Sequence, residues 1–124
     1  MCKKILIVED SRNISLMVKM CLEKYGYEVI SVYDGVEAVE KVFNIHPDLV
    51  LLDVVIPRMN GYLVAQTIKQ NDDTRHIPVI MMSAKAQMDD INNALKLGAE
   101  DYLVKPFSPD TLIEKIRKYI SMEG

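Results

Sequence analysis

Several short apolar runs in the sequence each end in a side chain that can take part in chemistry. The ends of these runs are Glu9 with Asp10, then Asp53, then Ser83, and finally Lys105. If the runs are parallel strands, their carboxyl ends share one edge of a sheet, which is where open α/β sheets bind ligands. The five side chains are therefore expected to converge on one small cleft, although they are far apart in the sequence.

The charges expected in this cleft indicate a metal ion. Three carboxylates and one ammonium group leave a net charge of −2. Crowded carboxylates push one of their number towards the protonated form, whereas a divalent cation neutralises them. Oxygen ligands favour a hard ion, and two or three carboxylates with water suit Mg²⁺ better than Ca²⁺. The expected cofactor is Mg²⁺, because the sequence has no cysteine or histidine cluster for zinc.

The same residue types fit phosphoryl transfer. A carboxylate can attack phosphorus and form an aspartyl phosphate, and the reaction then needs mostly positioning and charge neutralisation. Asp53 is therefore the expected phosphoacceptor, and Glu9, Asp10 and Asp53 are the expected metal ligands. Ser83 and Lys105 are expected to hold the phosphoryl group. Taken alone, Asp53 could equally cap the loop or helix that follows it.

The rest of the chain predicts the elements that must position these residues. The run Leu49–Leu52 has no polar residue, which is typical of a strand buried on both faces. The expected strands are Ile5–Val8, Glu28–Val32, Leu49–Asp53, Val79–Met82 and Tyr102–Val104, and a helical pattern follows each of them. This alternation predicts an α/β fold with a parallel sheet and right-handed crossovers. Three strands are apolar throughout and two are mixed, which fits the flavodoxin-like, doubly wound (βα)5 order 2-1-3-4-5.

Capping residues predict where the first helix begins and ends. Apolar residues recur at helical spacing over Ile14–Tyr25. Asp10 or Ser11 is the expected cap at the start of this helix, and Gly26 is expected to end it. A shorter third helix is predicted over Leu63–Ile68.

Length and composition restrict the classes of protein to which the chain can belong. The 124 residues suit one domain, here residues 1–124, and the net charge of −3 argues against direct nucleic-acid binding. The apolar segment near the N-terminus is too short for a signal peptide or a membrane span. Cys2 and Cys21 imply no disulfide framework, so a cytoplasmic location is expected.

As a set, the motifs resemble those of response-regulator receiver domains, and the resemblance extends from Lys4 to the last helix. The residues that carry it are Glu9-Asp10, Asp53 with Pro57 and Gly61 downstream, Ser83-Ala84, and Lys105-Pro106-Phe107. The resemblance implies a two-component signalling domain that catalyses only its own phosphorylation and slow dephosphorylation. A histidine kinase or phosphotransfer protein would donate the phosphoryl group to Asp53. Glu9 departs from the family pattern, since Asp is commoner at this position.

The resemblance also implies roles for residues outside the cleft. The backbone carbonyl of Val55 would complete the Mg²⁺ shell, and Tyr102 would turn inward when Ser83 moves towards the phosphoryl group. Val55 and Lys85 occupy positions that influence phosphoryl lifetime in the family. Neither side chain is suited to orienting a water molecule, so a long-lived phosphorylated state is expected.

The position of Tyr102 indicates which surface a downstream protein would bind. It lies on the fifth strand, and Ser83 begins the loop into the fourth helix. The expected binding face is therefore the fourth helix, fifth strand and fifth helix. The candidate contact residues are Ile91, Leu95, Val104, Lys115 and Lys118, with a place in the core as the alternative for Ile91 and Leu95.

Three other functions are compatible with parts of the pattern. An Mg²⁺-dependent phosphohydrolase would need a second acid two residues after Asp53, where the chain has Val55. A flavodoxin-like electron carrier would need a phosphate-binding loop after the first strand, where Glu9 and Asp10 would repel phosphate. A receiver that no longer takes phosphate would lack a site residue, whereas all five are present. A single-domain regulator is the expected organisation, and a fragment of a longer chain is the alternative.

Overall fold

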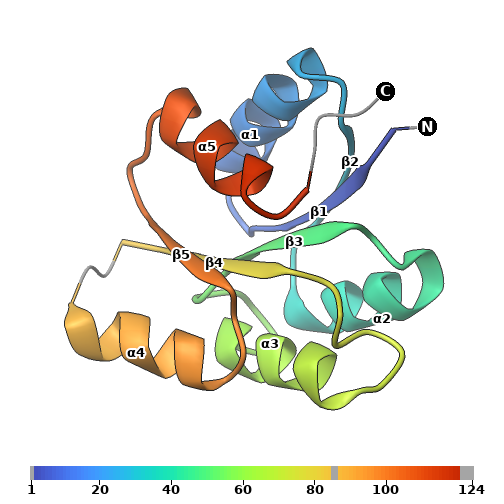
Figure 1. Cartoon of the computed structure of the whole chain (residues 1–124), viewed down its shortest axis with the longest axis vertical. Coiled ribbons are helices and arrows are strands. Elements are labelled where there is room, and N and C mark those ends of the chain that lie inside the picture. Colours follow the sequence, from blue (N-terminus) through green and yellow to red (C-terminus); the bar gives the residue numbers. More distant parts are fainter. Residues whose placement is uncertain (1, 85–86, 121–124) are drawn as a thin grey trace.

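The computed structural model describes residues 2–84 and 87–120, which contain five strands that alternate with five helices (Figure 1). The strands are β1 (Lys4–Val8), β2 (Glu28–Val32), β3 (Leu49–Asp53), β4 (Val79–Ser83) and β5 (Asp101–Val104). The helices are α1 (Arg12–Lys24), α2 (Gly35–Ile45), α3 (Gly61–Gln70), α4 (Met88–Lys96) and α5 (Pro109–Arg117). None of the described helices is long and apolar enough to cross a membrane.

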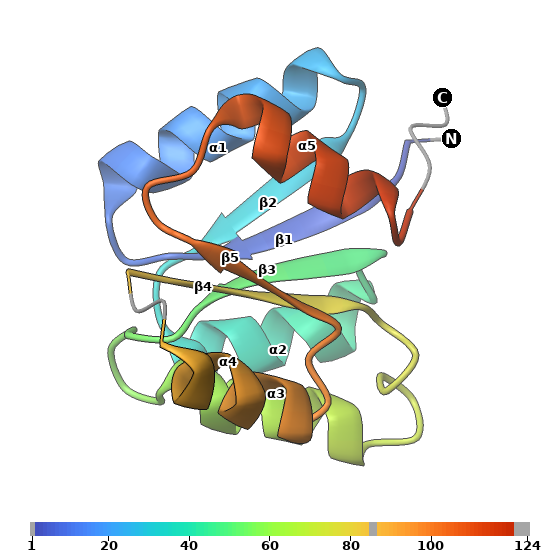
Figure 2. The same cartoon turned by 60° about the vertical axis from the view of Figure 1, so that its left-hand side comes forward.

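The strands form one parallel sheet between two layers of helices. The strand order is β2-β1-β3-β4-β5, and every pair of neighbours is parallel. Helices α1 and α5 cover one face of the sheet, and α2, α3 and α4 cover the other (Figures 1 and 2). The predicted flavodoxin-like order is confirmed, and with it the expectation that the mixed strands β2 and β5 lie at the edges.

Burial on both faces explains why β3 lies at the centre. All five residues of β3 and of β4 are buried, whereas β2 and β5 each have an exposed residue. Leu49 and Leu51 pack into the core under α1 and α5, while Val50 and Leu52 pack into the core on the opposite face. An apolar run of this kind is stable only between two helical layers.

Side-chain caps set the first residue of most helices. Ser11, and not Asp10, caps α1, because its Oγ accepts the Ile14 N–H at 3.4 Å. Asp34 and Ser108 cap α2 and α5 in the same way. Asn60 caps α3, so that helix begins two residues before the predicted Leu63 and extends beyond Ile68 to Gln70. The predicted ending of α1 is confirmed, since Gly26 lies just past its last residue with φ of +92°.

Gly61 fixes the path of the chain between β3 and α3. Its N–H donates to the Val54 carbonyl at 2.8 Å. A Cβ atom at Gly61 would collide with the carbonyl oxygen of Asp53 and the Cα atom of Val54. Because both are backbone atoms at the end of the central strand, only glycine fits here without displacing the Asp53 segment.

We predict that Gly61→Ala destabilises the fold by about 3 kcal/mol, because backbone atoms cannot yield as a flexible side chain would. Gly26→Ala is the comparison, since its Cβ would meet no atom within 4 Å and only its positive φ costs about 1 kcal/mol. Urea unfolding of the two variants measures the difference. Equal stability would show that the contact at Gly61 is not a constraint.

Candidate functional site

The carboxyl ends of the strands bring the predicted residues together at one edge of the sheet. Glu9 and Asp10 follow β1, Asp53 ends β3, Ser83 ends β4 and Lys105 follows β5. The Lys105 Nζ atom lies 2.7 Å from Asp53 Oδ2 and 2.6 Å from Glu9 Oε1. Residues 96 positions apart in the sequence therefore form a direct ion pair.

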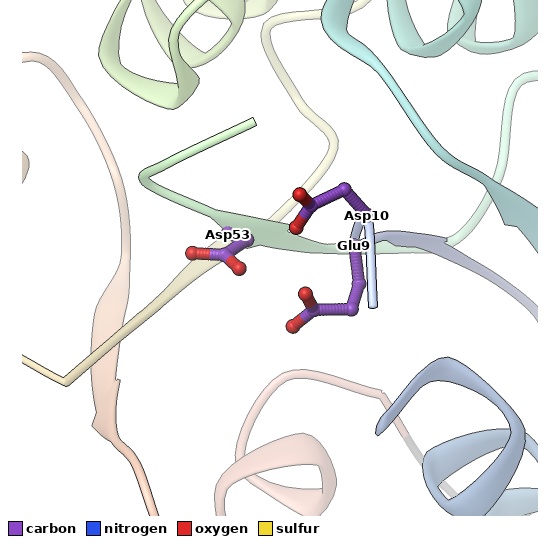
Figure 3. Close-up of side chains that lie close together, drawn as sticks. All are labelled: Glu9, Asp10 and Asp53. Carbon is purple, nitrogen blue, oxygen red and sulfur yellow. The ribbon is translucent and has the colours of Figure 1, made fainter. Parts of the chain in front are cut away.

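Three carboxylates face one another across this edge (Figure 3). One oxygen atom from each of Glu9, Asp10 and Asp53 lies within 4.8 Å of the others. Glu9 is 1% exposed and Asp53 is 5% exposed, whereas Asp10 is open to solvent. An all-oxygen set with one solvent-facing member fits a hard divalent cation that retains some water ligands.

Each buried carboxylate is held at both of its oxygen atoms. Lys105 binds one oxygen of Glu9 and one of Asp53. The Ser11 N–H donates to Glu9 Oε2 and the Val55 N–H donates to Asp53 Oδ1, both at 3.1 Å. The sequence analysis missed these two backbone donors, because their direction depends on loop conformation and leaves no signal in residue type.

Burial and pairing act in opposite directions on the ionisable groups. Burial raises the pKa of Glu9, and the neighbouring Asp53 adds to this, while hydrogen bonds from Lys105 and Ser11 only partly offset it. Burial alone would lower the pKa of Lys105, but its hydrogen bonds and ion pairs with the two carboxylates raise it above the usual value. Lys105 therefore remains an ammonium ion at neutral pH and balances one of the two buried negative charges.

An ion pair ties the loop after β3 to the start of α2. Arg58 has a φ of 69° and directs Nη2 at both Asp34 oxygens, at 3.1 and 3.0 Å. The Gly35 N–H also donates to the Pro57 carbonyl at 3.1 Å. The Glu37 N–H and Arg58 together lower the pKa of Asp34. The sequence analysis missed this contact, since its partners are 24 residues apart and share no motif.

The structure also shows the environment of the other predicted residues, apart from Lys85. Ser83 is buried and pairs in register with Val104 of β5. The Val55 side chain is 69% exposed. Tyr102 is buried on β5, and its hydroxyl has no hydrogen-bond partner among the residues that the structure describes. Lys85 lies outside the described residues.

The candidate contact residues on α4, β5 and α5 differ in exposure. Leu95 and Val104 are exposed, as predicted, whereas Ile91 is half-buried against the core. Lys115 is only half-exposed and binds Asp101 Oδ1 at 2.8 Å. Lys118 is exposed, with its Nζ 3.8 Å from Asp101 Oδ2. The exposed apolar part of this face therefore consists of Leu95, Val104 and Met88.

The family model of the response regulator receiver domain matches residues 5–117. The chain belongs to the response regulator receiver family. Receiver domains are signalling domains and not classical enzymes, so the phosphohydrolase and electron-carrier alternatives are set aside. The chain is 43% identical over 119 residues to the probable transcriptional regulator ycf27 of Cyanophora paradoxa, which covers 95% of this chain and 48% of that protein. This receiver thus spans about half the length of the first curated relatives that it matches.

Solved receiver structures share this fold. The chemotaxis response regulator CheY4 of Vibrio cholerae superposes with a TM-score of 0.92 at 30% identity, covering 97% of this receiver and 100% of that chain. The receiver domain of the sensor histidine kinase PA1611 from Pseudomonas aeruginosa gives a TM-score of 0.88 at 31% identity, covering 96% and 98%. That structure is described with a magnesium ion coordinated in the active site cleft.

We predict that Lys105→Met costs about 3 kcal/mol of folding stability near neutral pH without divalent cations, because it leaves two buried carboxylates unpaired. The loss should shrink as the pH falls. The pKa of Glu9 is raised in the folded state, so the protonated acid is favoured there. The stability that protonated Glu9 contributes is fully present below the pKa of Glu9 in the unfolded chain. It is lost as the pH rises through the pKa of Glu9 in the folded protein.

The free energy of unfolding in urea, measured at about pH 8 and at about pH 5, tests this effect. The lower pH is chosen because it is close to the ordinary pKa of a glutamate carboxyl group. Lys41→Met is the control, since Lys41 is exposed on α2 and its loss should change stability by less than about 0.5 kcal/mol. If Lys105→Met were as stable as Lys41→Met at both pH values, the ammonium group would not be what stabilises the two buried acids.

Proposed function

We propose that this receiver accepts a phosphoryl group on Asp53 from a phosphohistidine of a histidine kinase or phosphotransfer protein, and that residues 1–124 act as one phosphoacceptor domain. The observation that carries the proposal is the environment of the Asp53 carboxylate. It lies at the end of the central strand, held by Lys105 on one oxygen and by the Val55 N–H on the other, with two more acids within reach. A carboxylate fixed in this way is oriented to act as a nucleophile.

We propose that Glu9, Asp10 and Asp53, with the backbone carbonyl of Val55, hold Mg²⁺ here. The support is the all-oxygen donor set and the excess of negative charge that Lys105 alone does not balance. Bound Mg²⁺ would neutralise negative charge on the phosphoryl oxygens. Glu9 has the longer side chain at a position where Asp is usual, yet its Oε1 and Oε2 are both already fixed by hydrogen bonds.

The proposed transfer moves the phosphoryl group from a histidine nitrogen of the donor to an oxygen of Asp53. An Asp53 carboxylate oxygen forms a bond to phosphorus while the bond from phosphorus to the donor's imidazole nitrogen breaks. The bonding electron pair stays on the imidazole, which takes up a proton from solvent. Lys105 then pairs with a phosphoryl oxygen in place of the carboxylate oxygen, and the Ser83 hydroxyl donates to another.

The readout we propose uses Ser83, Tyr102 and the α4–β5–α5 face. Ser83 precedes the loop into α4, and Lys105 follows β5 directly, so both elements adjoin the site. Tyr102 is buried on β5, and its hydroxyl has no hydrogen-bond partner among the described residues. In the proposed readout, this inward position is one of two states that are in equilibrium. Phosphorylation can shift such an equilibrium only by its differential affinity for the two states, typically about 1–3 kcal/mol.

We predict that Asp53→Asn abolishes phosphorylation by acetyl phosphate, because the amide is not a nucleophile towards phosphorus. Intact-mass measurement should find one added phosphate on the unchanged protein and none on this variant. Asp48→Asn is the matched control. Asp48 precedes β3 at its opposite end and accepts the Lys4 N–H at 2.7 Å, so it flanks the same strand away from the site.

The metal dependence is tested in the same assay. Chelation of Mg²⁺ should stop labelling, and Asp10→Asn should raise the Mg²⁺ concentration required by about tenfold or more, as for other lost metal contacts. Equal labelling of Asp53→Asn and Asp48→Asn would refute the phosphoacceptor assignment. Labelling that persists in a chelator would refute only the role of the metal.

We predict that an acyl-phosphate mimic, beryllium fluoride with Mg²⁺, changes amide NMR shifts from Met88 to Lys118 as well as around Asp53. The reason is that Ser83 and Lys105 join the site to α4 and β5 and can satisfy the added acceptor oxygens. Asp53→Asn treated in the same way is the control and should show no such shifts. Changes confined to the loop after β3 would mean that α4, β5 and α5 do not read out the site.

A further inference from the structure

The outer edge of β2 lies beside a groove that the proposed phosphoryl chemistry does not use. Helix α1 packs along β2 on one face of the sheet (Figure 2). The groove between them has a volume of about 400 Å³, and its lining comes from α1, from β2 and from Tyr33 just after β2. None of the site residues Glu9, Asp53 or Lys105 lines it.

The strand presents unpaired backbone groups to this groove. The Glu28 N–H donates to the carbonyl of Lys3, just before β1, at 2.9 Å, and the Val32 carbonyl accepts from the Glu9 N–H at 3.2 Å. The even-numbered residues of β2 therefore direct their backbone groups towards β1. In a parallel strand, the N–H and C=O groups of one residue point to the same side of the strand, and those of the next residue point to the other side. Val29 and Ser31 therefore direct their N–H and C=O groups outward, where β2 has no neighbouring strand in the part of the chain that the structure describes.

The groove is positively charged, although the whole chain carries −3. Arg12 and Lys19 both line it from α1, and the Arg12 guanidinium carbon lies 4.0 Å from the centre of the Tyr33 ring. That stacking fixes one cation at the end of the groove. Within residues 2–84 and 87–120, no carboxylate side chain contributes to the lining. The groove is therefore complementary to an anionic ligand.

Two further contacts place hydrogen-bonding groups at this edge, and one of them already involves a carboxylate. The Tyr33 N–H, the next outward group after Ser31, donates to Glu37 Oε1 at 3.3 Å. A carboxylate of the chain itself thus already binds the end of the exposed edge. Beneath the groove, the buried Ser15 hydroxyl donates to Ser31 Oγ at 3.1 Å. A serine hydroxyl can both donate and accept, so the Ser31 Oγ atom can form a second hydrogen bond with a ligand.

We propose that the groove binds an extended acidic segment of a partner protein, which adds as a strand beside β2. The peptide backbone pairs with the outward groups of Val29 and Ser31, and its acidic side chains on the α1 side meet Arg12 and Lys19. The two cations are two helical turns apart, about 10 Å. Same-face residues of a strand recur about every 6.7 Å, so acids two or four positions apart reach both cations.

The backbone edge favours a peptide over a nucleic acid as the anionic partner. Val29 and Ser31 each present an acceptor as well as a donor, and an added strand satisfies both. A phosphodiester chain would satisfy only the donors and would leave the outward carbonyls facing a second row of acceptors. The leucine side chain of Leu16, 57% exposed at the groove, gives an apolar contact for alternate residues of a peptide.

A charge-reversal experiment tests the proposal. The probe is a capped peptide of about seven residues that alternates glutamate and valine, and a second peptide has lysine in place of glutamate. The unchanged receiver should bind the acidic peptide at low salt. The double variant Arg12→Glu with Lys19→Glu should bind it about tenfold more weakly and should gain affinity for the lysine peptide. The double variant Lys41→Glu with Lys96→Glu, exposed on α2 and α4, is the control and should retain binding within about twofold.

Amide hydrogen exchange tests strand addition itself. Binding should slow exchange at Val29 and Ser31, whereas Ile30, whose amide faces β1, should not change. A peptide with proline at its central position should lose binding, because it cannot donate there. These readouts do not depend on phosphorylation of Asp53.

Several results would overturn the proposal. These are no binding by the unchanged receiver, equal weakening in both double variants, or unchanged exchange at Val29 and Ser31. Equal binding of an oligonucleotide of the same charge would assign the groove to nucleic acid instead. Sedimentation of the receiver alone as a dimer that Arg12→Glu with Lys19→Glu disrupts would assign the edge to a second copy of this chain.

Discussion

The site depends on one ammonium group shared between two buried carboxylates. Lys105 follows β5 at the edge of the sheet, Asp53 ends the central strand, and Glu9 lies just beyond β1. Lys105 therefore joins three separate strands through contacts of 2.6 and 2.7 Å. A single cation cannot balance two buried acids together with Asp10. Burial, and to a smaller degree the neighbouring Asp53, raises the pKa of Glu9. The fold thus holds a residual negative charge at this edge, which favours a divalent cation.

Backbone groups hold the carboxylates in place where no further side chain is present. The Ser11 N–H that binds Glu9 belongs to the residue that caps α1, and the Val55 N–H that binds Asp53 begins the loop leading to Gly61. The close approach of Gly61 to Asp53 and the Arg58–Asp34 ion pair limit how that loop can move. The orientation of the acids is therefore a property of two loops as much as of the strands that precede them.

The sequence predicted the sheet order and the convergence of the site residues, because both follow from apolar runs and the residues that end them. It did not predict the Val55 and Ser11 donors or the Arg58–Asp34 pair. These depend on loop dihedral angles and on contacts between residues with no shared motif. The start of α3 was also misplaced, because Asn60 acts as a cap through a hydrogen bond to Leu63 N–H that apolar periodicity does not reveal. The partial burial of Ile91 and the pairing of Lys115 with Asp101 likewise depend on tertiary packing.

The two edges of the sheet differ in a way that separates their roles. At β5, Asp101 is bound by Lys115 and Tyr119 of the segment that contains α5, and Tyr102 is buried, so side chains of the chain itself cover part of this edge. Burial and the hydrogen bond to Asp101 raise the pKa of Tyr119 to about 12, so its hydroxyl stays protonated and this contact persists at neutral pH. Just after β2, the outward N–H of Tyr33 donates to Glu37, and two cations of α1 line the groove there. Lys105, the residue that follows β5, joins that edge of the sheet to Asp53 through an ion pair of 2.7 Å. No comparable ion pair joins β2 to Asp53 among the described residues, so the ion pairs of the site couple Asp53 to β5 and not to β2.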